Sequence, residues 1–472
     1  MVSRRVSTGQ DGAGKPAHRR RARQAGLLLL CSVGLAACVE LVGFGSGTTG
    51  GNAYRNRVNE VDTPDCPTTL PTDAQCHYRV TTTADSGVGS LRYAVNSSRR
   101  NIYIDFADGI GTPTNPIVLT SAIRIKGSNV TISALGDTAP GGTAYGVTIR
   151  DHGLILEGAQ HVVVRNLAIR NPSYADDVNQ IEDGIRITRD TALNEMSSDI
   201  LLQNISVTDF GDSQIDITDS HDITIAYATL GSDDPFHPRT TQKIGDTGTG
   251  NKWYDAGDRD HYERTMMINR GYRVTLHHNM FLGAHIRNPM VKTEVPLAGS
   301  PALDMRNNIV SGWGYPDSGE GPVLRGYSTA NVIGNILSPK SATHGGTPTL
   351  AITVCDDASA PSGRCDFPTY PKEVDAYVAG NTLLDAQGNE VVNSSTVWHP
   401  DDESTPGVAK FSTGFTDAAY DAYEQGACNA QLAGAWHYNS AANSWTQDRD
   451  GAIVNAYAAA VKAYCTAKYP PS

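Results

Sequence analysis

The sequence predicts an all-β protein whose main domain is a parallel β-helix, a solenoid of stacked coils, with long loop insertions and a small helical C-terminal extension. Short β-branched runs of three to five residues alternate with Asn, Asp, Gly and Ser over about 310 residues. The runs recur with a period in the twenties, and no helical pattern separates them. One such coil cannot bury its apolar side alone, so the coils must stack.

Composition limits the function classes. The chain has 472 residues, with 38 Lys and Arg against 50 Asp and Glu, for a net charge of −12. A strongly acidic protein is a poor candidate for nucleic-acid binding. The only long apolar run lies near the N-terminus, which excludes a protein that crosses the membrane several times and predicts no transmembrane span.

Residues 1–37 are expected to be an export signal. A segment rich in Arg precedes a short apolar stretch, Leu27 to Ala37, which ends in small residues and is too short to span a bilayer. The end of this stretch, Leu-Ala-Ala-Cys, resembles a bacterial lipoprotein box and makes Cys38 a candidate lipid anchor. An ordinary cleaved signal with a chance cysteine is the alternative. The mature protein is therefore expected to be secreted or tethered to the outer face of the cell membrane.

Residues 38–77 are expected to form a tether rich in Gly, Ser and Thr and an N-terminal extension, before a β-helix domain over 78–400. Ser90–Ser98 reads as a short helix that caps the open end of the solenoid. Insertions at 171–182, 189–198 and 231–263 are polar and are expected on one face, often the binding face. Leucine-rich repeats share the period but need a fixed Leu spacing that is missing, and a β-sandwich would give strands every 8–12 residues.

An Asn recurs after many of the strand runs. Its expected place is a turn, where each Asn bonds to its copies in the coils above and below. The Asn residues that define this pattern are Asn166, Asn204, Asn279, Asn308, Asn335 and Asn381.

The tail, residues 401–472, changes character and shows helical periodicity from Asp448 to Lys468, which predicts a C-terminal cap. Outside the signal the chain has six cysteines, an even number that favours disulfides in an exported protein. Close spacing suggests the pairs Cys66–Cys76 and Cys355–Cys365, which leaves Cys428–Cys465, although sequence alone permits other pairings.

Three aspartates fall at or within consecutive strand runs. Asp183 begins one run, and Asp212 and Asp216 lie in the next. Equivalent positions on neighbouring coils lie about 4.8 Å apart. Three carboxylates without soft ligands are typical of a hard-cation site, and Ca²⁺ is the natural choice for an exported protein. Asp also commonly ends a turn, and each residue taken alone would be read that way.

Basic residues cluster after the large insertion, at Arg264, Arg273, Arg287 and Lys292. Beside a calcium site on an acidic protein they indicate a polyanionic ligand, whereas isolated surface charges would be the simpler interpretation. His277 and His278 lie in one strand, so one is expected to face in and one out, and neither is assigned a chemical role.

The stretch from Gly89 to about Pro316 resembles the pectate lyase family of polysaccharide lyases, in the superfamily that includes pectin lyases. The resemblance is carried by SLRYAV, NVTISALGDTAPGG, VVVRNLAIRN, GDSQIDITDSHDITIAYATL, RTMMINRGYRVTLHHNMF and IRNPMVK. It implies a right-handed parallel β-helix that cleaves polygalacturonate by calcium-dependent β-elimination, an acidic polysaccharide as the substrate, and a monomer.

By position, the resemblance makes Arg287 the base that removes the C5 proton. Arg264 and Lys292 would bind substrate carboxylates, with Arg and Lys exchanged relative to the usual family pattern. Asp183, Asp212 and Asp216 would bind the calcium. Because Arg and Lys differ in fork geometry, the exchange puts the substrate preference in question more than the reaction class.

Two other functions fit a β-helix. A glycoside hydrolase of the polygalacturonase class needs clustered carboxylates as acid and base, and Asp233-Asp234 is such a pair, although it falls in the large insertion. A non-catalytic polysaccharide-binding β-helix would use the same groove without turnover. The choice among pectate, methylated pectin and other uronans, endo or exo action, and the number of calcium ions stay open.

Overall fold

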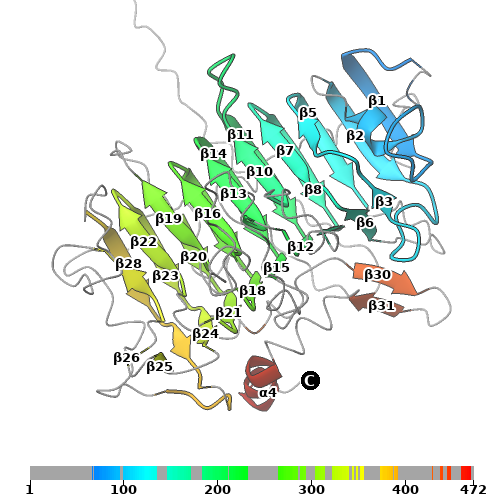
Figure 1. Ribbon diagram of the computed structural model, residues 1–472. Helices are drawn as coiled ribbons and strands as arrows, with labels where there is room; N and C mark the ends of the chain where they lie inside the picture. Colours follow the sequence, from blue (N-terminus) through cyan, green and yellow to red (C-terminus); the bar gives the residue numbers. More distant parts are fainter. Residues whose placement is uncertain are drawn as a thin grey trace, which may run out of the picture. The chain divides into compact units, whose positions relative to one another are not determined.

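The computed structural model of the 472-residue chain contains three long sheets in which every strand pairing is parallel (Figure 1). The chain divides into two units, 1–40 and 41–472, and all described residues belong to the second. The structure describes residues 66, 69–95, 99–134, 146–171, 183–210, 212–231, 264–284, 287–293, 303–313, 321–339, 343–344, 347–348, 351–355, 373–385, 387–391, 428, 436–439, 444–447 and 459–468. The parallel β-helix predicted from the sequence is confirmed.

Each coil contributes one strand to each sheet, so the strands of one sheet are neighbours in space but distant in sequence. The ten-stranded sheet contains β1 Asp73–Val80, β2 Arg100–Phe106, β5 Ser128–Ser133, β8 Gln160–Arg165, β11 Ser197–Gln203, β14 Ser220–Ala226, β17 Tyr272–His277, β20 Leu303–Arg306, β23 Thr329–Ile333 and β28 Asp375–Ala379. The eight-stranded sheet contains β4 Ile123–Ile125, β7 Leu154–Glu157, β10 Ile185–Thr188, β13 Ile215–Thr218, β16 Met266–Asn269, β19 Met290–Thr293, β22 Val323–Gly326 and β27 Thr353–Val354.

The nine-stranded sheet completes each coil. It contains β3 Ile117–Val118, β6 Val147–Arg150, β9 Leu167–Arg170, β12 Ser206–Thr208, β15 Thr229–Gly231, β18 Met280–Leu282, β21 Ile309–Ser311, β24 Ile336–Ser338 and β29 Thr382–Leu383. Two antiparallel hairpins are also described, β25 Thr343–His344 with β26 Thr347–Pro348, and β30 Trp436–Asn439 with β31 Ser444–Gln447.

The interior of the coils is apolar because alternate residues of each strand face inward. In the eight-stranded sheet, Ile185 pairs with Ile215 and Ile187 with Ile217, and all four are fully buried. Each such side chain contributes roughly 1.5–3 kcal/mol through burial. The residue between each pair faces outward, which places Arg186 beside Asp216 on the outer surface of this sheet.

Two helices are described. The expected capping helix is α1, Leu91–Ala94, and the Ser90 hydroxyl accepts a hydrogen bond from the Tyr93 amide at its N-terminus. The expected C-terminal helix is α4, Ala459–Lys468. Neither described helix is long and apolar enough to cross a membrane.

Two expected disulfides are present, Cys66–Cys76 and Cys428–Cys465. Cys355 is also disulfide-bonded, but Cys365 lies outside the described residues. The insertions 171–182 and 231–263 fall almost wholly outside the described residues too, as do Asp233-Asp234 and residues 1–65 with Cys38.

The asparagine ladder is confirmed in the C-terminal half of the solenoid. The side-chain amide of Asn279 donates to Oδ1 of Asn308 at 3.0 Å, and Asn308 and Asn335 donate in turn to Asn335 and Asn381, each at 2.9 Å. The expectation is wrong for Asn166 and Asn204. Both have positive φ and occupy the position just before the ladder. In the coil of Asn204 the ladder position itself is held by Ile205, whose carbonyl accepts from Thr229. The pattern therefore merges two turn positions that each favour Asn for a different reason.

Candidate active site

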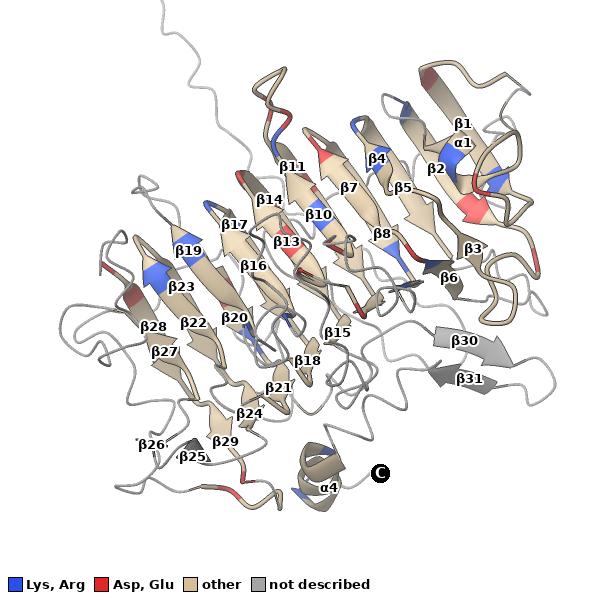
Figure 2. Ribbon diagram, in the orientation of Figure 1, with Lys and Arg blue, Asp and Glu red and all other residues tan. Residues whose placement is uncertain are grey.

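The residues singled out by the sequence meet on the outer surface of the eight-stranded sheet. Asp216 lies in the middle of β13, Asp183 lies two residues before β10, and Asp212 lies three residues before β13. Figure 2 shows an acidic residue on β13 at this place. Arg264 and Arg287 lie just before β16 and β19, the next two strands of the same sheet. The stacking of the coils thus assembles residues that are up to 104 positions apart, from Asp183 to Arg287.

Asp212 is the centre of an ion-pair cluster. Its Oδ1 accepts hydrogen bonds from Nη1 of Arg264 at 2.6 Å and from Nη1 of Arg287 at 3.2 Å. The side chain of Arg264 is 8% exposed and that of Arg287 is 18% exposed, whereas Asp212 is 36% exposed. Two largely buried guanidinium groups therefore share one carboxylate oxygen, and each positive charge lies close to the other.

The two other aspartates repel each other, and the side chain of Asp183 is 8% exposed while Asp216 is half-buried. Burial, followed by the charges of Asp216 and Asp212, raises the pKa of Asp183 well above its usual range. Burial also raises the pKa of Asp216, although hydrogen bonding to Thr218 and the charge of Arg186 act in the opposite direction. Asp183 accepts a hydrogen bond from the Ser213 amide at 3.0 Å, and Asp216 accepts one from the Thr218 hydroxyl at 2.7 Å.

This donor set suits a hard divalent cation. The pKa values of Asp183 and Asp216 are raised even though Arg186 lies 4.0 Å from Asp183, so a further positive charge would stabilise the ionised carboxylates, and oxygen ligands are those that Ca²⁺ prefers. As the side chains stand, no three acidic, His or Cys residues of the described ranges are positioned as a metal-binding group. In particular, the ion pairs of Asp212 direct its Oδ1 to the two arginines.

Arg287 lies in a place that disfavours its positive charge. Burial and the neighbouring Arg264 charge lower the pKa of Arg287, while Asp212, Asp216 and Asp183 act in the opposite direction. Its backbone is fixed, because the Arg287 carbonyl accepts from the Thr265 hydroxyl at 2.6 Å and from the Met266 amide at 2.9 Å. Arg287 has a φ of 61°, which aims the side chain in a direction that regular strand geometry would not give.

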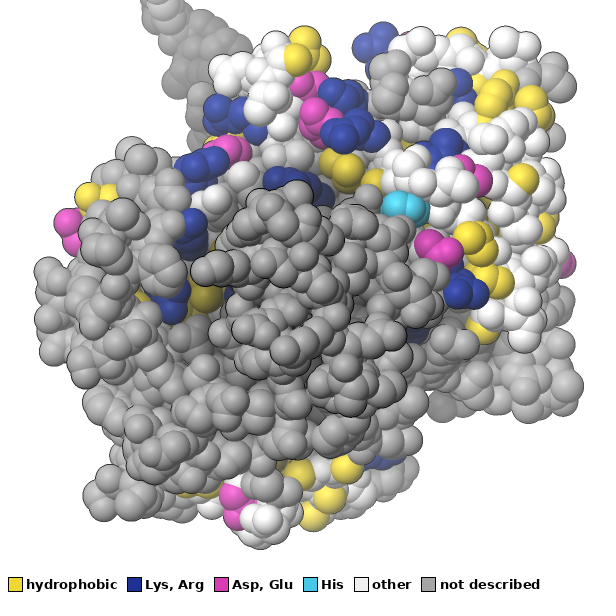
Figure 3. Space-filling model, in the orientation of Figure 1, with side chains coloured by type: hydrophobic (Ala, Val, Ile, Leu, Met, Phe, Trp, Pro, Cys, Tyr) yellow, Lys and Arg dark blue, Asp and Glu magenta, His cyan; other side chains and the backbone are white. Residues whose placement is uncertain are grey.

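Lys292 stands apart from the ion-pair cluster. It lies in β19, two strands from β13, and it pairs in register with Asn269 of β16. Lys292 and Asp216 both lie on the outer surface of this sheet, so Lys292 lies on the same face of the solenoid as the ion-pair cluster. Figure 3 shows basic and acidic side chains gathered across the upper part of the visible face.

Several supporting residues have no individual signal in the sequence. The Gln214 side chain, 1% exposed, donates to the Arg264 carbonyl at 3.1 Å and accepts from the Phe210 amide at 3.2 Å. Asn288 accepts from Thr265 at 3.1 Å and donates to the Ala284 carbonyl, also at 3.1 Å. Both residues lie inside motifs that carry the family resemblance, GDSQIDI and IRNPMVK, and that is the only signal that could have indicated them.

The two histidines differ from expectation. His277 ends β17 and points away from the apolar interior, and His278 follows with a φ of 55°, so strand alternation does not extend to it. Both are buried, at 0% and 3% exposed, and their Nδ1 atoms lie 2.8 Å apart. His278 also stacks on Tyr227, with ring centroids 4.9 Å apart. They are packed residues of the solenoid and lie outside the ion-pair cluster.

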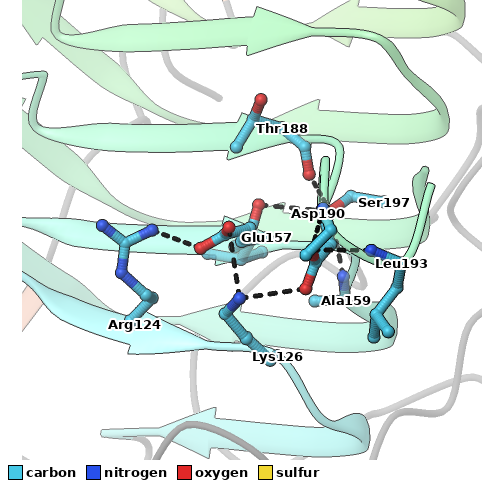
Figure 4. Close-up of polar contacts among 10 residues, drawn as sticks. Arg124, Lys126, Glu157, Ala159, Thr188, Asp190, Leu193 and Ser197 are labelled. Carbon is cyan, nitrogen blue, oxygen red and sulfur yellow. Dashed lines mark hydrogen bonds and ion pairs between the residues drawn. The ribbon is translucent and has the colours of Figure 1, made fainter. Parts of the chain in front are cut away.

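The insertion at 189–198 is pinned to preceding coils (Figure 4). Lys126 lies 2.9 Å from Asp190 and 3.2 Å from Glu157, which also pairs with Arg124. Oδ1 of Asp190 accepts hydrogen bonds from the amides of Ala192 and Leu193. This network holds the loop after β10 in a defined position next to the sheet that carries the candidate site.

Comparisons with known proteins find sequence relatives among proteins described as pectate lyases. No family model matches the chain. A protein of Aspergillus terreus called probable pectate lyase C is 26% identical over 317 residues, which cover 66% of this chain and 58% of that protein. A protein of the same description from Aspergillus fumigatus is 27% identical over 262 residues, covering 55% and 48%. The chain is related to the pectate lyases. It spans about half the length of these relatives.

Solved structures give weaker likenesses. The cedar-pollen major allergen has a TM-score of 0.41 at 18% identity, covering 84% of this chain and 92% of that one. A Xanthomonas campestris pectate lyase has a TM-score of 0.38 at 14% identity, covering 84% and 98%. A pectate lyase from Bacillus sp. N165 in complex with trigalacturonate has a TM-score of 0.38 at 15% identity, covering 81% and 97%.

Proposed function

We propose that the protein is an exported polysaccharide lyase that cleaves polygalacturonate by calcium-dependent β-elimination. The observation that carries this proposal is the position of Arg287, largely buried beside Arg264 and in contact with Asp212, within reach of the charges of Asp183 and Asp216. Such an arrangement combines a cation of lowered pKa with an anion cluster, and strongly perturbed groups mark functional sites. The related pectate lyases support the reaction class.

In this proposal Arg287 is the base. A neutral guanidine takes the proton from C5 of a uronate, the electron pair forms the C4–C5 double bond, and the C4–O bond breaks. The leaving oxygen takes a proton from water. An ordinary guanidinium is a poor base, since it stays protonated at neutral pH. Burial and the neighbouring Arg264 both favour the neutral form.

The other charged residues would hold the substrate. Arg264 and Lys292 would bind uronate carboxylates and stabilise the negative charge that develops there when the C5 proton leaves. Asp183, Asp212 and Asp216 would hold a calcium ion, which when bound neutralises acidic groups of protein and substrate. For Asp212 this role requires its Oδ1 to exchange an arginine contact for the ion.

Export, attachment through Cys38 and a monomeric state are also part of this proposal, and they rest on the sequence alone. They fit a substrate that is an extracellular polymer. Of the two alternatives, the hydrolase would depend on Asp233-Asp234, outside the described residues, and a binding protein would leave the perturbed Arg287 without a use.

The test is absorbance at the unsaturated-uronide band during incubation with polygalacturonate, with calcium and then with a chelator. Elimination predicts a rise that calcium supports and the chelator stops. Reducing ends without the absorbance would indicate a hydrolase. Neither signal, with retained binding, would indicate a binding protein, and both of these results would overturn the proposal.

A further inference from the structure

A second group of polar and aromatic residues lies where the eight-stranded sheet turns into the ten-stranded sheet. We call it the rim cluster: Arg189, His221, Asp222, Tyr272 and Arg273. Arg189 follows β10, His221 and Asp222 lie at the start of β14, and Tyr272 and Arg273 begin β17. Figure 2 shows charged residues at the starts of these strands. None of the five takes part in the proposed reaction.

The two aromatic rings form a fixed stacked pair. His221 and Tyr272 pair in register, and their rings stack with centroids 4.7 Å apart and planes 19° apart. Nδ1 of His221 lies 2.7 Å from Oδ2 of Asp222, which holds the imidazole in place. The His221 side chain is 26% exposed and Tyr272 is half-buried, so the stack reaches the surface.

Arginines border this surface. Nε of Arg273 lies 2.6 Å from Oδ1 of Asp222, and the Arg273 side chain is 42% exposed. Nη1 of Arg189 donates to Oδ1 of Asn194 in the pinned loop at 3.0 Å. The charges of Asp222, Arg273 and Arg189 all act on the Tyr272 hydroxyl, where burial and Asp222 raise its pKa and the two arginines lower it. With His221 neutral, two cations and one anion leave the rim cluster positive on a protein of net charge −12.

The rim cluster adjoins the candidate active site. Lys292 pairs with Asn269, and the amide of Arg270, the next residue, donates to the Lys292 carbonyl at 3.0 Å. Tyr272 follows only two residues later. The chain therefore leads directly from the outer surface that carries Asp216 and Lys292 over the edge of the sheet to the aromatic stack.

We propose that the rim cluster is an accessory binding surface for an acidic polysaccharide chain, beside the candidate active site. Carbohydrate sites combine an exposed aromatic plane, which contacts the apolar face of a sugar ring, with nearby polar groups that fix its orientation. Arginine adds recognition of uronate carboxylates. The proposal rests on the proposed function for its choice of ligand, and it predicts that the protein holds polymer through contacts outside the residues that react.

The experiment measures retardation in gels that contain polygalacturonate, with every variant made in an Arg287→Ala background so that the polymer stays intact. Tyr272→Ala should weaken binding about tenfold, the change that 1.4 kcal/mol produces. Tyr272→Phe retains the stack and should bind almost as well as the parent. Tyr377→Ala is the matched control, because Tyr377 is also half-buried and lies in the same sheet, three strands beyond Tyr272.

Arg273→Asn provides a second variant. Asn tolerates the positive φ of 55° at this position, so the backbone is kept while the charge is removed. Binding should weaken and become less sensitive to salt. Thermal unfolding checks that each variant is folded.

Unchanged retardation for folded Tyr272→Ala and Arg273→Asn would overturn the rim cluster as a binding surface. Equal retardation by neutral xylan would overturn the assignment to an acidic chain. These results are separable from the reaction. Should the wild type give no unsaturated product while its retardation still depends on Tyr272, the proposed function would be wrong and the binding surface would stand.

Discussion

Arg287 donates a hydrogen bond to Oδ1 of Asp212 at 3.2 Å, and Arg264 donates to the same oxygen at 2.6 Å. This shared contact joins the candidate base to the carboxylate cluster. It also brings two positive charges together in a largely buried place, which is the physical reason that Arg287 loses its proton more readily than an ordinary arginine.

Replacing Arg287 tests the assignment of the base. Arg287→Ala should lower the rate of unsaturated-product formation by about 10³-fold, within the range typical of a lost general base. Its far-ultraviolet circular dichroism should match that of the wild type. Arg124→Gln is the matched control, because Arg124 lies on the same sheet, three strands from Asp216, and its loss should leave the rate unchanged. A fully active Arg287→Ala would remove this residue from the mechanism.

Asp183→Asn tests the metal site without reference to activity. Asp183 is buried among like charges, so in chelator its neutralisation should raise the melting temperature. Calcium should raise the melting temperature of the wild type and have a much smaller effect on the variant. Asp108→Asn, at an exposed turn, should respond to calcium like the wild type. Equal calcium shifts for the wild type and Asp183→Asn would contradict the assignment.

The dependence of kcat on pH should reflect the base form of Arg287. Because only the neutral guanidine accepts a proton, kcat should rise with pH and reach its maximum on the alkaline side. Arg264→Gln removes the nearby positive charge that lowers the pKa of Arg287. The alkaline limb should therefore move to higher pH in this variant, whatever its effect on rate. A maximum well below pH 7, or a limb that moves to lower pH, would be inconsistent with Arg287 as the base.

The asparagine ladder makes a prediction about stability. Asn308 is fully buried, accepts from Asn279, and donates to Asn335 and to the Leu276 carbonyl. Asn308→Ala leaves these partners unsatisfied and should lower the free energy of unfolding by about 3 kcal/mol. Gln387→Ala, at an exposed turn, should change it by less than about 0.5 kcal/mol. Chemical denaturation measures both, and equal effects would show that the ladder is dispensable.

The sequence predicted the solenoid because its signal is repeated in every coil. Ile185, Ile215 and their counterparts recur at one register, so errors at single positions do not matter. The same register predicted that Asp183, Asp212 and Asp216 share one face of the solenoid, and the family resemblance singled out Arg287. Periodicity alone could not distinguish the ladder position of Asn279 from the positive-φ position of Asn204, because Asn suits both.

What escaped prediction depends on single side chains in three dimensions. The hydrogen bond from the Gln214 side chain to the Arg264 carbonyl joins residues 50 positions apart, and no repeat in the sequence predicts it. The stack of His221 on Tyr272 likewise requires the pairing of β14 with β17 across a long insertion. His278 is buried beside His277, and its positive φ breaks strand alternation, which local sequence does not reveal.

Elimination and hydrolysis at this site are distinguished by degrading polygalacturonate in water labelled with heavy oxygen. Elimination breaks the C4–O bond of the substrate without adding solvent oxygen to the new chain ends, so mass spectrometry should find unsaturated products without label at the scissile bond. Elimination by Arg287 predicts this result with calcium present, and its loss in Arg287→Ala. Saturated products that carry the label at their new reducing ends would mean hydrolysis and would exclude elimination.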